Sequence, residues 1–274
     1  MLDNPGNDIK AIDGLIAAYM SQPVEVEKVK AVGFIPAREQ STRFPGKPLA
    51  DICGRPMIMR VYERAVGSLL LDNVYVATDS GEIFDMVCGL GGQALMTSRE
   101  HPSGTDRIAE AAVQLGLDGM DIAVNIQGDQ PLFDSVMIEE VMQPLLSDPA
   151  IPMSTLIYKI VNDEEITHPN AVKTVVDKDG FAMYFSRATI PFFRDLKSAP
   201  VYYKHHGIYA YRNDFLQKFS ALPRGFLEQA EGLEQLRAME NGFRIKVVIT
   251  EKDSIEVDTP VDLERVRAAY GKII

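Results

Sequence analysis

Residues 35–58 read IPAREQSTRFPGKPLADICGRPMI, and this stretch does most to decide the fold. An apolar run ends at Ile35, and a basic loop with a glycine follows it. Glycine lets the backbone approach a ligand closely, and Arg and Lys neutralise phosphate charge. The stretch therefore predicts a strand that leads into a cradle for a polyphosphate, with an exposed basic turn as the alternative. The loop residues concerned are Arg38, Gln40, Ser41, Arg43, Gly46 and Lys47.

The order of these residues matches neither a Walker A loop nor the dinucleotide-binding G-x-G-x-x-G pattern. Within the loop, Lys47 is best placed to reach a β or γ phosphate. Arg38, nearer the strand, is expected to stabilise charge at the α phosphate.

Beyond this stretch, short apolar runs alternate with helical patterns along the chain. Such alternation predicts an α/β fold with a mostly parallel sheet and helices on both faces. Ligands of these sheets bind beyond the C-terminal ends of the strands, so motifs that directly follow strands are expected to line one crevice. The expected strands are 31–36, 73–77, 93–96, 122–126, 153–158 and 244–250, and the expected helices are 56–70, 81–90, 106–115, 135–146, 227–241 and 260–270.

Composition excludes several classes of function. A net charge of -11 argues against a nucleic-acid surface, and it requires an anion-binding site to concentrate its cations or to use a divalent metal. The chain shows neither a long apolar run nor the start of a signal peptide, so no membrane partner is expected. The two cysteines have no C-x-x-C spacing, which favours a reduced, cytoplasmic setting.

Two acidic motifs are candidate metal ligands. In VNIQGDQP (124–131) an apolar strand ends just before Asp129. A carboxylate at such a strand end is a natural ligand for Mg²⁺, which is commonly held by one or two carboxylates. Asp258, at the end of another extended run, is the candidate second acid. The alternative for both is helix capping, although Asp134 and Ser135 are nearer to the helix that follows Asp129.

Two further groups of residues are candidates for recognising the substrates. HPSGTDR (101–107) offers small donors at a helix start that suit a nucleobase or ribose, with an ordinary helix cap as the alternative. On the acceptor side, a cation and an imidazole lie among aromatic residues and suit a carboxylated polyol. Acidic residues at helical spacing follow, for which an exposed helix face is the alternative. The acceptor-side residues are Arg187, Lys204, His205, His206, Tyr209, Glu228, Glu231, Glu234 and Gln235.

At these motifs the sequence resembles the 3-deoxy-manno-octulosonate cytidylyltransferases over about residues 31–270, with residues 1–30 as an N-terminal extension that carries a short amphipathic helix. The stretches IPAREQSTRFPGKPLADICGRPMI, VYVATDS, HPSGTDR, VNIQGDQPL, KHHGIYAYR, LEQLR and VDTPVDLERV appear in the family's order.

The resemblance implies a Rossmann-like nucleotidyltransferase with a smaller sugar-binding and dimerisation region at about 170–240. The implied reaction transfers CMP from CTP to the anomeric hydroxyl of 3-deoxy-manno-octulosonate (Kdo), for lipopolysaccharide synthesis, in a magnesium-dependent cytoplasmic homodimer. The implied catalytic residues are Arg38, Lys47, Asp129 and Asp258, the last two on Mg²⁺. The implied nucleotide contacts are Ala37, Arg38, Lys47, Thr78, Ser103 and Gln127. The implied sugar contacts are Arg187, His205, Tyr209, Glu228, Glu231 and Gln235.

The sequence departs from the family pattern at four places in these motifs. The common GDEP reads GDQP, with Gln130, and the common HLG reads HHG, with His206. Glu39 follows Arg38 where the family form is IPAR-Y, and the smaller Ala230 stands in the usual LE-x-I-E helix. GDQP and KHxGxYAY also resemble the enzymes that activate the 8-amino analogue of Kdo. That analogue or another sugar acid is therefore the alternative acceptor, and a catalytically silent nucleotide-sugar binding protein is the alternative of a second class.

Overall fold

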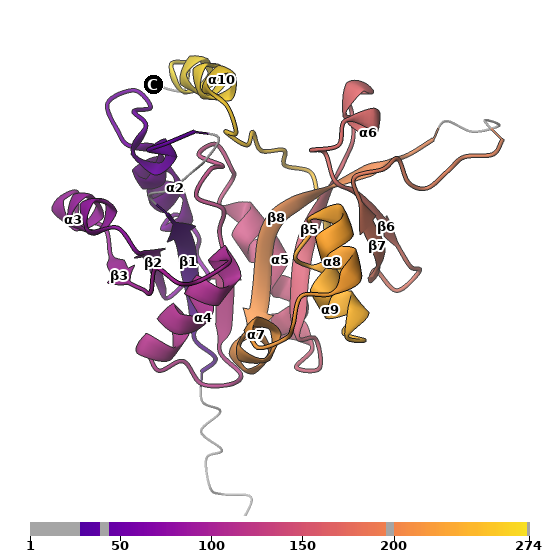
Figure 1. The fold of residues 1–274 in the computed structure, drawn as a ribbon, viewed down its shortest axis with the longest axis horizontal. Coiled ribbons are helices and arrows are strands. Elements are labelled where there is room, and N and C mark those ends of the chain that lie inside the picture. Colours follow the sequence, from indigo (N-terminus) through magenta and orange to yellow (C-terminus); the bar gives the residue numbers. More distant parts are fainter. Residues whose placement is uncertain (1–27, 39–43, 196–199, 273–274) are drawn as a thin grey trace, which may run out of the picture.

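The computed structural model describes residues 28–38, 44–195 and 200–272 (Figure 1). The helix predicted in the N-terminal extension, and the loop residues Gln40, Ser41 and Arg43, lie outside these ranges. The strands are β1 (Ala31–Ala37), β2 (Asn73–Thr78), β3 (Ala94–Met96), β4 (Ile122–Asn125), β5 (Met153–Lys159), β6 (Lys173–Val176), β7 (Ala182–Ser186), β8 (Tyr203–Arg212) and β9 (Lys246–Thr250).

Ten helical segments follow or connect these strands within the described residues. They are the 3₁₀ helix η1 (Lys47–Leu49) and α2 (Met57–Ala65), α3 (Gly81–Gly89), α4 (Gly104–Gln114), α5 (Val136–Ser147), α6 (Glu164–Thr167), α7 (Asn213–Ser220), α8 (Phe226–Glu231), α9 (Leu236–Glu240) and α10 (Pro260–Tyr270). Nowhere in the described part of the chain is a helix both long and apolar enough to cross a membrane.

The described strands form one sheet in the order β3-β2-β1-β4-β8-β5-β9, with β6 and β7 attached through β8. β3, β2, β1 and β4 run parallel to one another, whereas β8 runs antiparallel to both of its neighbours, β4 and β5. Two antiparallel steps restore the original direction, so β5 and β9 point the same way as β4. The C-terminal ends of these parallel strands therefore meet along one edge of the sheet, as the sequence predicts.

Helices cover both faces of the sheet, which explains why β1 is apolar along its whole length. Ala31 and Ile35 pack on one side with α2, α3 and α5. Val32 and Phe34, at the alternate positions, pack on the other side with α4, α7 and α9 (Figure 1). A strand buried on both faces reads as a continuous hydrophobic run rather than as an alternating one.

Two predicted helices differ from the observed ones. The predicted helix 56–70 ends at Ala65, just before Gly67 and a turn. The predicted single helix 227–241 is wrong, because the chain breaks into α8 and α9 at Gly232. Gly232 has φ of 63°, a left-handed conformation that suits glycine and ends a helix. The acidic residues 228, 231 and 234 therefore do not share one helix face.

Candidate active site

Three carboxylates gather at the C-terminal edge of the sheet. Asp129 follows β4, whereas Glu256 and Asp258 lie on the extended segment between β9 and α10. One oxygen from each can be chosen so that all three lie within 4.8 Å of one another. The backbone joins the two segments directly, since Val257 N–H donates to the carbonyl oxygen of Asp129 at 2.9 Å.

Lys47 lies against this acidic cluster, as the sequence predicts for a site that combines cations with acids. Its Nζ is 2.7 Å from Asp129 Oδ2 and 3.6 Å from Asp258 Oδ1. Gly46 precedes it in a left-handed conformation, φ 70°, which turns the chain into η1. The turn brings a cation from the front of the chain to acids more than 80 residues away.

The acidic cluster suits a hard divalent cation. Carboxylate oxygens are the ligands that Mg²⁺ prefers, together with water and phosphate oxygens. The acids of the cluster do not cap α10. Its cap is Thr259, which accepts from Asp262 N–H, and Asp262 completes the capping box. Asp262 therefore has a structural role, and Asp258 lies in the acidic cluster with Asp129, where its metal contact remains a prediction.

Arg38 directly follows β1 in a half-buried position. Burial lowers the pKa of Arg38, and the positive charge of Arg107 lowers it further. Asp79, Asp106 and Glu234 oppose this effect. A guanidinium remains charged at neutral pH after such a shift, so Arg38 can still neutralise a phosphate.

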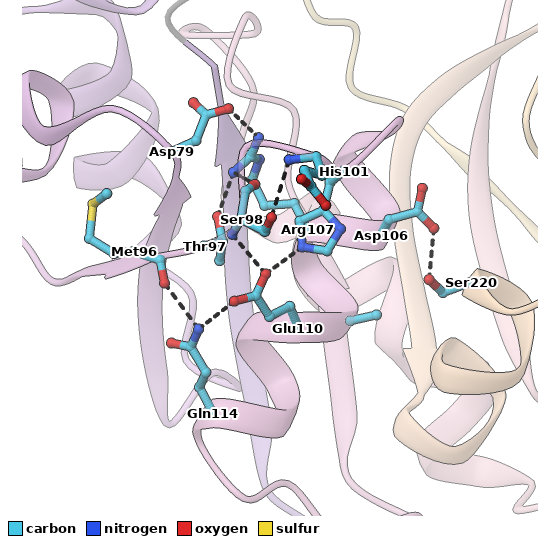
Figure 2. A network of polar contacts seen from close by, with 12 residues as sticks. Asp79, Met96, Thr97, Ser98, His101, Asp106, Arg107, Glu110, Gln114 and Ser220 are labelled. Atoms are coloured by element: carbon cyan, nitrogen blue, oxygen red, sulfur yellow. Dashed lines mark hydrogen bonds and ion pairs between the residues drawn. The ribbon is translucent and has the colours of Figure 1, made fainter.

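Arg107 is fully buried and organises the N-terminal end of α4 (Figure 2). It donates to Asp79 Oδ2 at 2.7 Å, to Thr97 Oγ1 at 2.5 Å and to the carbonyl oxygen of Ser98 at 3.2 Å. Asp79 pairs with Arg107, whereas Ser80 caps α3.

The predicted nucleotide contacts lie at the same edge, but several already have structural partners. Ser103 caps α4 by accepting from Asp106 N–H, and its hydroxyl donates to the Asp106 carboxylate at 2.7 Å. Thr78 is fully buried at the end of β2, beside Ala37 at the end of β1. Gln127 Nε2 donates to the carbonyl oxygen of Gly207 at 2.6 Å. Their contacts with a nucleotide remain predictions.

A cavity of about 330 Å³ connects the acidic cluster to the predicted sugar side. Asp129 and Glu256 line it together with His205, Tyr209 and Gln235. The cavity therefore brings together residues that three separate motifs supply. Its other lining residues include Asn125, Gln127, Gln130, Gly207, Glu234 and Tyr211.

The other three predicted sugar contacts, Arg187, Glu228 and Glu231, form hydrogen bonds with other groups of the protein. Arg187 donates through Nε to the carbonyl oxygen of Glu231 at 2.7 Å, and Glu231 accepts from the backbone N–H of Arg187 and from the Ser186 hydroxyl. Both oxygens of the buried Glu228 carboxylate accept from Arg237, at 2.7 and 2.8 Å. These contacts explain how α8 and α9 are held beside the cavity, and the proposed sugar contacts of these three residues stay predictions.

Two histidines lie on β8 by the cavity: the half-buried His205, which lines it, and the buried His206. Burial, with a smaller effect of His206, lowers the pKa of His205 to about 3. Burial also holds the pKa of His206 well below its usual range, although Asp253, 3.5 Å from its Nε2, acts in the opposite direction. Both imidazoles are therefore neutral at physiological pH, so His205 meets a ligand as an uncharged group.

Glu256 and Asn125 were not assigned roles from the sequence. A signal for Glu256 existed, because residues two apart on an extended segment point to the same side, which pairs it with Asp258. Asn125 ends a run that is otherwise apolar, and its side chain is 4% exposed with no partner for Oδ1 among the described residues. A polar residue at the end of so apolar a strand could have marked Asn125 as a candidate site residue.

Comparison with known proteins places this geometry in a family. The sequence model of the family described as cytidylyltransferase matches residues 32–249. The chain belongs to the cytidylyltransferase family. Membership confirms the predicted nucleotidyltransferase.

Named relatives within the family fall into two groups. A 3-deoxy-manno-octulosonate cytidylyltransferase of Syntrophus aciditrophicus is 59% identical over 238 residues, 87% of this chain and 96% of the relative. An 8-amino-3,8-dideoxy-manno-octulosonate cytidylyltransferase of Shewanella oneidensis is 55% identical over 232 residues, 84% of this chain and 94% of the relative.

A solved structure confirms the predicted fold class. It is described as CMP:2-keto-3-deoxy-manno-octonic acid synthetase complexed with CTP, and it matches with a TM-score of 0.84 and 44% identity. The match covers 89% of this chain and all of that chain.

Proposed function

We propose that this protein transfers CMP from CTP to the anomeric hydroxyl of Kdo, with release of pyrophosphate. The observation that carries the proposal is the single cavity that joins Asp129 and Glu256 to His205, Tyr209 and Gln235. Such a cavity can hold the reacting phosphate of one substrate beside the hydroxyl of the other. The identities of the Syntrophus relative and of the CTP-bound synthetase support the same assignment.

The chemistry needs positioning and charge neutralisation rather than a covalent enzyme intermediate. Lys47, beside the acidic cluster, and Arg38, just after β1, would neutralise the triphosphate. Gln127 lines the cavity, and its side chain donates to the carbonyl oxygen of Gly207. The buried polar side chains of the cavity would orient the acceptor hydroxyl and exclude water.

Mg²⁺ is the proposed cofactor, held by Asp129 and Asp258 with Glu256 as a third donor. A bound magnesium ion would polarise the α phosphate and help to ionise the sugar hydroxyl. Lys47 contacts two of the same acids, so it would shift toward the phosphates as the metal takes over the carboxylates.

Pyrophosphate release from CTP tests the function directly, with Kdo, with its 8-amino analogue and without any sugar. The two acceptors differ only in the group at C8, so their kcat/KM ratio identifies the preferred one. We expect release with Kdo. A preference for the amino sugar would reassign the acceptor, and no release with any sugar acid would favour a binding protein.

A homodimer is the proposed assembly. Residues 187–195 and 200–202, between β7 and β8, project away from the body of the protein (Figure 1), and Phe192 among them has 88% of its surface exposed. Met183 on β7 is 62% exposed as well. A second copy would cover these apolar side chains, and sedimentation equilibrium at micromolar concentration should give twice the chain mass. The monomer mass at that concentration would contradict the proposal.

A further inference from the structure

An irregularity in the pairing of β5 with β8 places one hydroxyl among three polar atoms. Thr155 pairs with Tyr209 while Leu156 pairs with His206, so Gly207 and Ile208 bulge out between the two pairs. The fully buried Oγ1 of Thr155 lies 3.1 Å from the carbonyl oxygen of His206 and 2.9 Å from that of Ile208. It is also 3.0 Å from His205 Nε2.

Counting protons decides the direction of these hydrogen bonds. A threonine hydroxyl has one proton to donate and two lone pairs to accept with. The carbonyl oxygens of His206 and Ile208 can only accept, so the proton must go to one of them or be shared. If it went to His205 instead, both carbonyl oxygens would face hydroxyl lone pairs at hydrogen-bond distance, inside a buried site where such unpaired contacts are costly.

We propose that Thr155 is a positioning residue that fixes His205 as its Nε2–H tautomer, so that Nδ1 meets the sugar acid as a hydrogen-bond acceptor. The inference deepens the proposed function and rests on it for the identity of the ligand. His205 borders the cavity, and its remaining polar ring atom is Nδ1, for which no described residue serves as a partner.

This tautomer restricts which part of the substrate can contact His205. A neutral ring with an unprotonated Nδ1 accepts from a hydroxyl or an ammonium group and repels a carboxylate. The carboxylate of the sugar acid must therefore lie against donors elsewhere in the cavity. Gln235 is one such group, because its side chain is 5% exposed and its Nε2 has no partner among the described residues.

The tautomer can be measured without any substrate. In protein labelled with ¹⁵N-histidine, long-range ¹H–¹⁵N spectra distinguish a protonated ring nitrogen from an unprotonated one, and His205→Asn assigns the signals. We expect protonated Nε2 and unprotonated Nδ1 for His205, unchanged between about pH 5 and 8, the range in which an ordinary histidine titrates. The opposite tautomer in the wild type would overturn the proposal, whether or not any variant folds.

Variants test the role of Thr155. Thr155→Val should let the ring populate both tautomers and raise KM for the sugar acid about tenfold, the loss of roughly one hydrogen bond, with KM for CTP unchanged. Thr155→Ser should restore the wild-type spectrum and KM. Thr174→Val is the matched control, since Thr174 is equally buried and its hydroxyl has no partner among the described residues.

The outcomes separate this inference from the proposed function. An unchanged tautomer and sugar KM in Thr155→Val would contradict the positioning role even if the enzyme releases pyrophosphate normally. Absence of pyrophosphate release with every sugar acid would contradict the proposed function, while the spectrum of the wild type would still decide the tautomer.

Discussion

Val257 and Asp129 are joined by a backbone hydrogen bond of 2.9 Å, although 128 positions separate them in the sequence. The bond runs between the loop after β4 and the segment after β9. It carries Glu256 and Asp258, the two neighbours of Val257, to the Asp129 side of the site. The acidic cluster is thus positioned by main chain, and its side chains can change without loss of the framework.

Asp129→Asn should therefore abolish function while leaving the fold intact. The amide is a poorer ligand for a divalent cation and a poorer partner for Lys47. We expect weaker Mn²⁺ binding by calorimetry and a fall in pyrophosphate release on the order of a hundredfold or more. Asp85→Asn, at an exposed position of α3, is the control. Near-normal turnover in Asp129→Asn would refute its metal role.

Gly207→Ala should damage the site through Gln127. A Cβ at position 207 would lie 3.1 Å from Gln127 Cγ and would push that side chain from its place. Small displacements of positioning groups are costly, so kcat/KM should fall on the order of tenfold to a hundredfold. Gly89→Ala, where a Cβ has nothing within 4 Å, is the control and should retain full activity. Equal activity of the two variants would show that Gln127 tolerates the shift.

Glu228→Gln should affect stability more than sugar binding. The substitution removes the carboxylate that accepts two hydrogen bonds from the buried Arg237 and leaves Glu234, at 3.4 Å, as its charged partner among the described residues. Breaking such a buried pair costs about 3 kcal/mol. Urea unfolding should show this loss, while KM for the sugar acid stays within about twofold. Glu264→Gln removes an exposed partner of Arg267 and should cost under about 1 kcal/mol. A large rise in sugar KM with normal stability would restore the sugar contact predicted from the sequence.

His206→Leu should make the protein more resistant to acid. The folded state keeps His206 neutral, because burial depresses its pKa, whereas the unfolded chain protonates it near pH 6.5. The unfolded state therefore binds more protons as the pH falls, and the wild type loses stability until the pH passes the depressed pKa. Between pH 7 and 5 this loss amounts to about 2 kcal/mol for one buried histidine.

Unfolding free energies at the two pH values check this prediction. The wild type should lose about 2 kcal/mol more than His206→Leu over that interval. The exposed His168 provides the control, since His168→Leu should follow the wild type. Parallel curves for the wild type and His206→Leu would mean that His206 titrates normally in the folded protein.

Much of the fold, and the meeting of Asp129 with Asp258, follow from local sequence. Apolar runs predict β1 to β5 within a residue or two, and the rule that parallel strands end at one edge brings Asp129 to the loop of Lys47. The pairing of Asp129 with Asp258 also agrees with the prediction, because each ends an extended run.

The remaining features depend on contacts between distant segments. The sequence does not distinguish a carboxylate that faces a sugar from one that pairs with an arginine, and Glu228 shows the difference. Thr155 carries no signal, because its role arises from a bulge in the strand across from it. The break at Gly232 was detectable, since a glycine inside a helical pattern weakens that pattern.

The order in which the chain is synthesised has a consequence for when this catalyst can begin to work. Lys47 and Asp129 emerge from the ribosome early, yet Glu256 and Asp258 emerge only near the end of the 274 residues. A nascent polypeptide, or any fragment cut ahead of Glu256, holds one carboxylate of the three. If the proposed magnesium site is the catalytic one, translation itself delays activity until the β9–α10 segment is in place.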